Sequence, residues 1–288
     1  MKRLLNNMLK LLETITDPGK ENYPNEDIII ISSDYYIILD GATGLGPSRI
    51  KESDSDAYWF VNAFKQYFLA QLANYSDVKV LLQNTLLKLE LEYKKLVNTL
   101  PTKKYEFPSA GMILLHKIND MEVNAYRLGD CELFHCTPNQ VTKVFKDSKL
   151  NDLDAISINK LSKHLLKGID YQEARKLILP TLQKHRELMN TKDGYWVLSI
   201  IQSSITEIIN NIECISIDLT RDSSLLLVSD GYGAIVEKYK QSNICQYTLE
   251  ETLSKIRTIE KLDQELLTYP RLKHSDDSTA ILLINQEN

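Results

Sequence analysis

Short apolar runs that end at an acidic residue recur along the chain, and the first two lie close together. Residues 28–31 and 35–39 have the length and the β-branched or aromatic content of strands, and three polar residues separate them. This pattern predicts two antiparallel strands joined by a hairpin turn. The start of the first strand then lies beside the end of the second, so we expect Glu26, Asp27 and Asp40 to converge at one edge of a sheet.

Helical periodicity follows these two strands. Apolar residues recur every three or four positions in residues 54–75 and again in 78–97, and Ser76 or Asp77 can cap the second segment. Two long amphipathic helices in succession are typical of a layer that packs on the outside of a sheet.

Strand-like runs return after residue 108, with short turns between them. The runs cover residues 110–117, 121–130, 131–136 and 140–145. Connections this short predict an antiparallel meander. It carries a further acid, Asp130, directly after Gly129.

The rest of the chain continues in blocks of one kind of element. Residues 152–190 are polar, with helices expected at 153–165 and 171–188. Further strands are expected at 194–200, 213–219, 225–228 and 279–285, and helices at 233–239 and 249–267. Blocked rather than alternating elements favour an α+β layered fold over a doubly wound sheet. Since no linker composition interrupts the sequence, we expect a single domain spanning residues 1–288.

The composition narrows the function classes. The 288 residues carry a net charge of −5, which gives no general attraction for nucleic acid or for an anionic membrane. No apolar run reaches transmembrane length, and polar residues interrupt the apolar N-terminal stretch that a signal peptide would need. We expect a soluble, cytoplasmic protein that binds neither nucleic acid nor a membrane.

Acids at the ends of the predicted strands are the strongest indication of chemistry. They are Glu26, Asp27, Asp40, Asp130, Asp230, Asp276 and Asp277. Each alone is most often a turn former, but several together repel one another unless a cation neutralises them. An oxygen-only ligand set favours Mg²⁺ or Mn²⁺ over zinc or copper. Two such ions can activate a water and clamp a phosphoryl group, so the pattern indicates hydrolysis of phosphate esters.

The glycine-rich turn GATGLG at residues 41–46 suggests two other classes of site. Its spacing differs from the GxGxxG of dinucleotide-binding proteins, and no GK[ST] follows as in a P-loop. A haloacid-dehalogenase-type nucleophile would be followed by a second aspartate where this chain has Ala42. Both alternatives are weak.

Five short motifs resemble those of the PPM (type 2C) metal-dependent protein serine/threonine phosphatases, in a bacterial-type single-domain form. They are PNED (24–27), LDGATG (39–44), RLGDCELF (127–134), LLLVSDG (225–231) and DDSTAILL (276–283), in the family's order across nearly the whole chain. The resemblance implies a four-layer αββα sandwich, in which two antiparallel sheets lie face to face and helices flank them.

The resemblance also implies a ligand set for two Mn²⁺ or Mg²⁺ ions. Asp40 would bridge both ions, and the Gly41 carbonyl would bind one of them. Asp230 and Asp276 would complete the ligands of one ion. Hydrolysis would proceed by attack of a metal-bridging water, so these three aspartates would be catalytic.

Three more acids have secondary roles in the same resemblance. Glu26 and Asp27 would hold the other ion, largely through water, and Asp130 would bind a third, looser ion.

The chain departs from the family pattern at two positions. The family usually places a phosphate-binding Arg a few residues before the NED-type motif, where this chain has Asn22, with Lys20 as the nearest cation. A Lys supplies charge without the bidentate fork, so Lys20 would bind phosphate more weakly. Many members carry another acid where Ala234 stands, which puts the third ion in doubt. Residues 152–190 fall where the family has its variable flap, so we expect them to select partners.

Three functions follow from these expectations. The first is a phosphatase that acts in signalling on phosphoserine or phosphothreonine in proteins and opposes a serine/threonine kinase. The second is a pseudophosphatase, a binding or regulatory module that keeps the fold but lacks efficient phosphate capture. The third is a phosphomonoesterase of small molecules.

Overall fold

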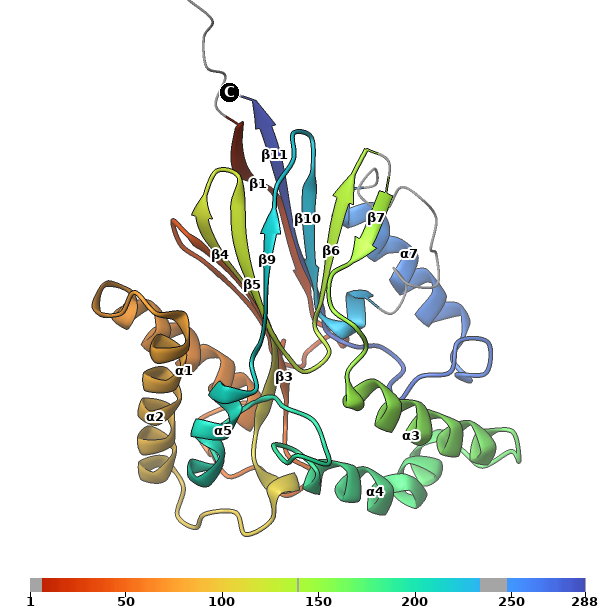
Figure 1. Ribbon diagram of the computed structural model, residues 1–288. Coiled ribbons are helices and arrows are strands. Elements are labelled where there is room, and N and C mark those ends of the chain that lie inside the picture. Colours follow the sequence, from red (N-terminus) through yellow and green to blue (C-terminus); the bar gives the residue numbers. More distant parts are fainter. Residues whose placement is uncertain (1–6, 139, 234–247, 288) are drawn as a thin grey trace, which may run out of the picture.

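Two antiparallel sheets pack face to face, and helices cover both outer faces (Figure 1). The structure is a computed structural model that describes residues 7–138, 140–233 and 248–287. This arrangement confirms the α+β sandwich that the motifs implied. The predicted helix at 233–239 and the position of Ala234 lie outside the described residues, apart from Gly233.

The first sheet holds both ends of the described chain. Its strands, in spatial order, are β1 (Asn7–Asp17), β11 (Ser278–Glu287), β10 (Ser224–Val228), β6 (Glu132–Thr137) and β7 (Gln140–Lys143). The second sheet has the order β2 (Asp27–Ile31), β3 (Tyr35–Ala42), β4 (Ser109–Asn119), β5 (Glu122–Leu128) and β9 (Glu213–Asp218). The short strand β8 (Leu198–Ser199) also pairs with β4.

The strand β3 shows why the sequence has continuous apolar runs rather than alternating ones. Tyr36 and Ile38 face the first sheet, where they join a core with residues such as Leu227 of β10. Ile37 and Leu39 point the other way, into the core beneath the helices. Because both faces of this strand are covered, every position between Tyr35 and Leu39 is apolar.

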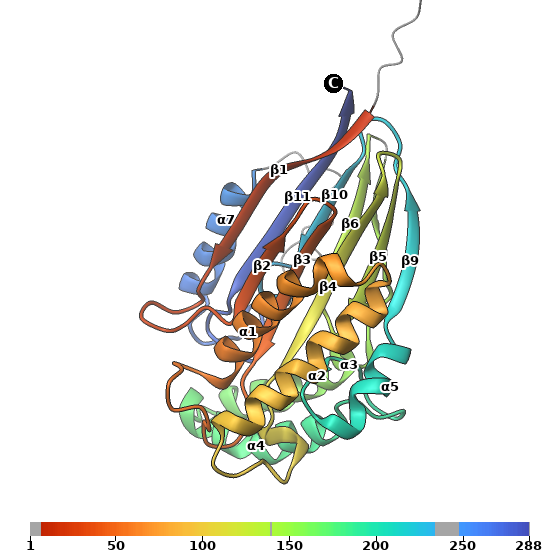
Figure 2. The same cartoon turned by 90° about the vertical axis from the view of Figure 1, so that its left-hand side faces the viewer.

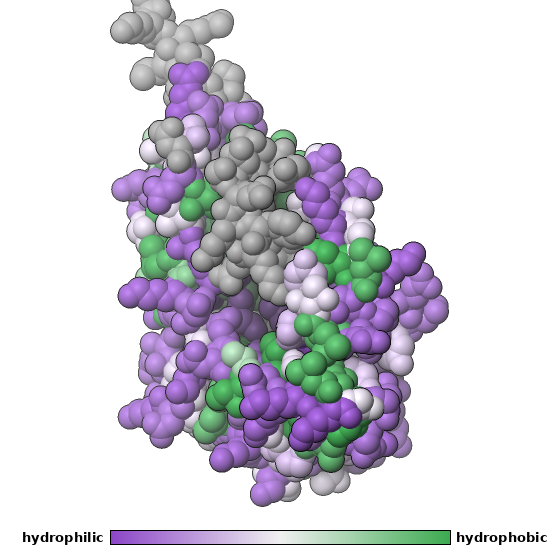
Figure 3. Space-filling model, turned by 90° about the vertical axis from the view of Figure 1, so that its right-hand side faces the viewer, coloured by the Kyte–Doolittle hydropathy of each residue, from purple (hydrophilic) through white to green (hydrophobic). Residues whose placement is uncertain are grey.

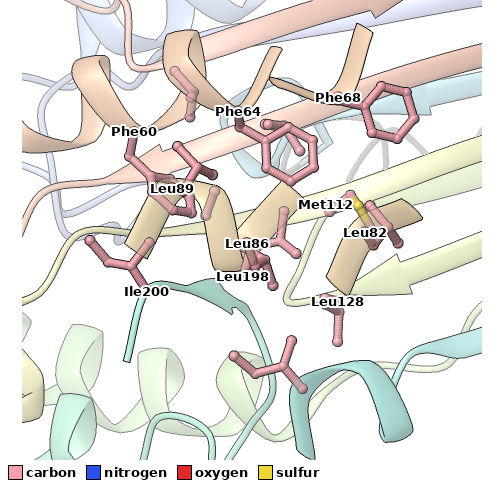
Figure 4. Packing of buried hydrophobic residues seen from close by; sticks show 14 of the residues in the cluster. Phe60, Phe64, Phe68, Leu82, Leu86, Leu89, Met112, Leu128, Leu198 and Ile200 are labelled. Carbon is pink, nitrogen blue, oxygen red and sulfur yellow. The ribbon is translucent and has the colours of Figure 1, made fainter. Parts of the chain in front are cut away.

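The helices α1 (Asp56–Gln71) and α2 (Val78–Leu96) cover the outer face of the second sheet (Figure 2). Figure 4 shows their packing, in which Phe60, Phe64 and Phe68 of α1 meet Leu82 and Leu86 of α2 above the sheet. The sequence predicted both helices and the cap of the second. The Asp77 carboxylate accepts from the Val80 N–H at 3.0 Å and so begins α2. A short helix that was not predicted, α5 (Ile205–Asn210), packs against α2.

The helix α7 (Leu249–Leu262) lies on the outer face of the first sheet. Leu249, Leu253 and Ile256 form its buried side. The predicted end at residue 267 is wrong, because the chain turns at Asp263. The Asp263 carboxylate accepts from three main-chain N–H groups, those of residues 267–269, and so folds them into a loop.

The polar insert forms a pair of helices, α3 (Lys149–Leu165) and α4 (Tyr171–Glu187), as the sequence predicted. Leu161 packs against Ala174, Ile178 and Leu182 between them. The pair lies across one end of the sandwich, below the strand ends (Figure 1). Three 3₁₀ turns complete the described elements: Leu72–Asn74, Lys104–Glu106 and Gln202–Ser204.

The predicted meander is wrong at one junction. β4 pairs with β5 and β6 pairs with β7, but β5 and β6 belong to different sheets. The chain crosses between the sheets at Gly129, whose φ is +80°, and the Cys131 side chain is buried in the core between them. A Cβ on Gly129 would lie 2.9 Å from the Cα of Gly111, so the crossing also needs close approach of two backbones.

Two further segments complete the comparison with the sequence. The N-terminal segment, for which no element was predicted, is an edge strand, β1, whose pairing with β11 runs as far as Asp17. The predicted strand at 194–200 is irregular except at β8, because β4 offers only Ser109 and Ala110 for pairing there. Among the helices of the described residues, none combines the length and the hydrophobicity that a membrane crossing requires.

Substitution of Gly129 tests the crossing between the sheets. Gly129→Ala should lower the free energy of unfolding by about 2–4 kcal/mol, because a Cβ there adds a backbone clash to the strain of a positive φ. Gly168 is a matched control, since its φ is +77° and a Cβ added to it would have no neighbour within 4 Å. Gly168→Ala should cost only about 1 kcal/mol. Urea denaturation measures both, and equal losses would contradict the role of close approach.

Candidate metal centre

The β2–β3 hairpin brings the first predicted acids together. Asp27 stands opposite Asp40 in the strand register, as the sequence predicted. Asp40 in turn lies opposite Gly111 of β4, where the absence of a side chain leaves room for Asp130. A Cβ on Gly111 would be 3.2 Å from the Oδ1 atom of Asp130. Asp130 therefore reaches the hairpin from the crossing between β5 and β6.

The first sheet delivers the remaining predicted acids from its own strand ends. Asp230 follows β10, and its main-chain N–H donates to Asp40 Oδ2 at 3.3 Å. Asp276 precedes β11, and β10 and β11 are hydrogen-bonded neighbours, so their adjacent ends bring Asp276 near Asp230. The two sheets thus contribute aspartates to one place, as the hypothesis of strand ends requires.

The negative charges of these aspartates repel one another. Burial and the neighbouring charges of three aspartates keep the pKa of Asp40 well above its usual value. Burial raises the pKa of Asp27 to about 8, although the neighbouring side chains of Ser229 and Thr279 oppose the shift. Burial also raises the pKa of Asp130, with the Asp230 charge as the next cause. Each carboxylate disfavours the ionised form of the others, so a nearby positive charge would stabilise the ionised cluster.

Glu26 and Gly41 lie beside the cluster. The Gly41 N–H donates to the carbonyl oxygen of Glu26 at 3.1 Å, and Gly41 lines the cavity in front of the aspartates. The Glu26 carboxylate is held by Thr43, whose hydroxyl donates to Glu26 Oε1 at 2.6 Å. Unlike Asp40, Glu26 and Asp27 do not line the cavity.

Asp277 has a structural role instead. Its carboxylate accepts from the Gly19 N–H at 2.8 Å and from the Glu26 N–H at 2.7 Å. These bonds fasten the loop between β1 and β2 to the start of β11, which places Glu26 beside the cluster.

A cavity of about 690 Å³ opens in front of the aspartates. Asp40, Asp130, Asp230 and Asp276 form one wall. The helices α3 and α7 supply apolar walls, with Ile158 from the first and Ile256 and Ile259 from the second, and the loop of residues 269–273 closes another side. On the side of the molecule where α3 and α7 lie, hydrophobic patches alternate with hydrophilic ones (Figure 3).

The cavity also has charged lining residues that the sequence did not single out, and three of them matter for the acid cluster. They are Asp154 on α3, Arg186 on α4 and Lys273 in the loop before β11. Burial and the Asp230 charge raise the pKa of Asp154 to about 7, although Arg186 and Lys273 oppose the shift. No strand-end pattern marks these residues, because two lie on helices and one lies in an irregular loop.

Lys20 lies elsewhere. Its ammonium is 5.3 Å from the centre of the Tyr23 ring, and it does not line the cavity. Phosphate binding by Lys20 therefore stays a prediction.

The aspartates supply the oxygen ligands that a hard cation prefers, but they are not arranged as a coordination shell. Within residues 7–138, 140–233 and 248–287, no three His, Cys, Asp or Glu side chains form a preformed cage for a metal ion. The buried Asp27 Oδ2 atom nevertheless has no hydrogen-bond partner in this part of the chain. Carboxylates that are close together, partly buried and short of donors fit Mg²⁺ or Mn²⁺, provided that the side chains reorient around the ions.

Comparison with solved structures identifies the fold. The chain is similar to the serine/threonine phosphatase Stp1 from Staphylococcus aureus, with a TM-score of 0.57 and 16% identity over 99% of this chain and 97% of that one. It is also similar to the PPM Ser-Thr phosphatase MsPP from Mycobacterium smegmatis in complex with cacodylate, with a TM-score of 0.52 and 15% identity over 96% and 99% of the two chains.

A third similar structure contains metal. The catalytic domain of the serine/threonine protein phosphatase PstP in complex with two manganese ions gives a TM-score of 0.50 and 12% identity over 98% of this chain and 100% of that one. No family model matches the sequence, and neither does any curated protein. The protein therefore has the fold of the bacterial PPM serine/threonine phosphatases, as the motifs implied.

Replacement of Asp154 tests the electrostatics of the cluster in the metal-free protein. An acid with a raised pKa in the folded state costs no stability below its unfolded pKa of about 4, and the cost grows until the pH passes about 7. Asp154→Asn should therefore be more stable than wild type at pH 8 and equal to it at pH 4. Thermal unfolding with chelator at both pH values measures this, with the exposed Asp193→Asn as control. If the difference in stability between Asp154→Asn and wild type were the same at both pH values, the raised pKa of Asp154 would be contradicted.

Proposed function

We propose that the protein is a Mn²⁺- or Mg²⁺-dependent phosphatase that hydrolyses phosphoserine and phosphothreonine in proteins. The observation that carries this proposal is the convergence of Asp40, Asp130, Asp230 and Asp276 on one wall of a large cavity. The likeness in fold to serine/threonine phosphatases supports the same reaction class.

The proposed ligands are those implied by the motifs. Asp40, the Gly41 carbonyl, Asp230 and Asp276 would hold the ions at the cavity wall. Glu26 and Asp27 would hold the other ion, largely through water. Asp130 would hold a third ion. When bound, the ions would supply the Lewis acidity that activates water and stabilises charge on the phosphoryl oxygens.

Arg186 is the residue that we propose for phosphate binding. Its guanidinium lines the cavity and donates to the Ser109 hydroxyl at 3.4 Å. Among the described residues it forms no ion pair with a carboxylate, so most of its donors remain available. A planar fork with several donors suits a phosphate, which the predicted Lys20 would bind only as a point charge.

The remaining walls favour a peptide over a small polar metabolite. Ile158, Ile256, Ile259 and Leu272 line the cavity beside the charged groups. Apolar walls of this kind can bury residues next to a phosphorylated side chain and exclude water from the reacting group. We place the protein in the cytoplasm, where its substrates would be products of a serine/threonine kinase, and we assign choice among them to the insert at 152–190.

A pseudophosphatase is the second candidate, and one specific observation favours it. The Lys273 ammonium lies 2.5 Å from Oδ1 of Asp276, one of the proposed ligands, so a side-chain cation already engages a carboxylate that the metal would need. The protein would then bind phosphoproteins or partners without turnover.

Activity measurements separate these candidates. Wild type with millimolar Mn²⁺ should hydrolyse a phosphothreonine peptide, and Asp40→Asn should lower kcat at least about 100-fold because it removes a charge shared by both ions. The control Asp193→Asn should retain wild-type activity. Metal binding without turnover would support the pseudophosphatase. Turnover of small phosphate esters alone would point to a phosphomonoesterase, and wild-type activity in Asp40→Asn would exclude the assigned site.

Substitution of Arg186 tests phosphate capture. Arg186→Lys keeps the charge but loses the bidentate fork, so we expect kcat/KM to fall about tenfold, mostly through a higher KM. Arg175→Lys on the same helix is the control, since Arg175 does not line the cavity. Kinetics with a phosphothreonine peptide measure both variants. An unchanged KM in Arg186→Lys, together with a raised KM in Lys20→Met, would instead assign phosphate binding to Lys20.

A further inference from the structure

The Lys273 ammonium places a positive charge within the acid cluster. Its ammonium nitrogen lies 2.5 Å from Asp276 Oδ1, and both side chains line the cavity. Its charge also reaches Asp230, where it opposes the effect of burial and of Asp276 on the pKa of that carboxyl group. Asp230 and Asp276 are the two residues proposed to complete the ligands of one metal ion.

The backbone around Lys273 is held in place on both sides. Arg271 donates to Asp263 Oδ2 at 2.8 Å, which fixes the loop before Lys273. Arg257 donates to the carbonyl oxygen of Asp276 at 3.0 Å, which fixes the chain after it. The ammonium can therefore leave Asp276 by rotation of its own side chain. That side chain is 52% exposed, so solvent is open to the ammonium once its bond to Asp276 is broken.

We propose that Lys273 is a resident cation that competes with the divalent ion for Asp276, so that metal binds there only when the ammonium withdraws. This inference rests on the proposed function, because it takes Asp276 as a metal ligand. An ammonium and a divalent ion on one carboxylate repel each other strongly, since like charges a few ångströms apart are poorly screened in a partly buried site. Without metal, the ammonium offsets the repulsion among Asp40, Asp230 and Asp276.

This competition has two measurable consequences. Metal affinity is lower than the carboxylates alone would give, because binding must first break a charge-assisted hydrogen bond. Removal of the ammonium should therefore tighten metal binding by about tenfold, which corresponds to about 1.4 kcal/mol. The metal-free protein should in turn lose stability, because the cluster loses its counter-charge.

The test is a calorimetric titration of the intact, chelator-treated protein with Mn²⁺. Lys273→Met removes the charge and keeps a side chain of similar length, and we expect its Kd for Mn²⁺ to be about tenfold lower than that of wild type. Lys65→Met is the matched control, because the Lys65 ammonium donates to the carbonyl oxygen of Ile29 at 3.2 Å and does not line the cavity. The control should bind Mn²⁺ as wild type does.

The outcomes separate this inference from the proposed function. If Lys273→Met binds Mn²⁺ as tightly as wild type or more weakly, Lys273 does not compete with the metal ion for Asp276. The proposed metal site would not be contradicted by that result. Absence of Mn²⁺ binding in all three proteins would overturn both proposals.

Thermal unfolding gives a second readout. With chelator, Lys273→Met should melt about 2–4 °C below wild type, and saturating Mn²⁺ should remove the deficit. Equal melting temperatures of the metal-free proteins would contradict the proposal. If Lys273→Met does not fold, Lys273→Gln supplies the same comparison of charge.

Discussion

Repulsion among carboxylates at one end of the sandwich is the constraint on which the rest of the site depends. Asp27, Asp40, Asp130 and Asp230 raise one another's cost of ionisation, and burial adds to it. A fold that merely had to be stable would avoid such a cluster, because each carboxylate replaced by an apolar residue would relieve it. The cluster therefore indicates a cation, supplied by metal ions, by Lys273, or by each in turn.

The topology explains how distant parts of the chain meet there. The hairpin of β2 and β3 brings two acids from the second sheet, and the ends of β10 and β11 bring two from the first. The crossing at Gly129 links the sheets and delivers Asp130 at the same end. The insert of α3 and α4 then lies across this end and adds Asp154 and Arg186 to the cavity. One end of the sandwich thus carries all the charged groups on which the proposed chemistry relies.

The sequence predicted the parts of this arrangement that local patterns encode. Antiparallel pairing of two adjacent strands was enough to place Asp27 opposite Asp40. The crossing between the sheets was not predicted, because the positive φ of Gly129 and its close approach to Gly111 depend on residues that are distant in sequence. Lys273 and Arg186 were not predicted as site residues either, because no periodicity marks a side chain that reaches a cavity from a loop or a helix end. Asp277 was grouped with the other acids at strand ends, yet its hydrogen bonds to main-chain N–H groups are visible only in three dimensions.

The proposed chemistry depends on divalent ions that the aspartates share around Asp40. Anomalous diffraction at the manganese edge from crystals soaked in Mn²⁺ tests it directly. We expect two anomalous peaks, each within about 2.3 Å of an Asp40 carboxylate oxygen, with Asp230 and Asp276 beside one of them and the Lys273 ammonium displaced. Absence of peaks at this cluster, or ions bound without contact to Asp40, would contradict the account.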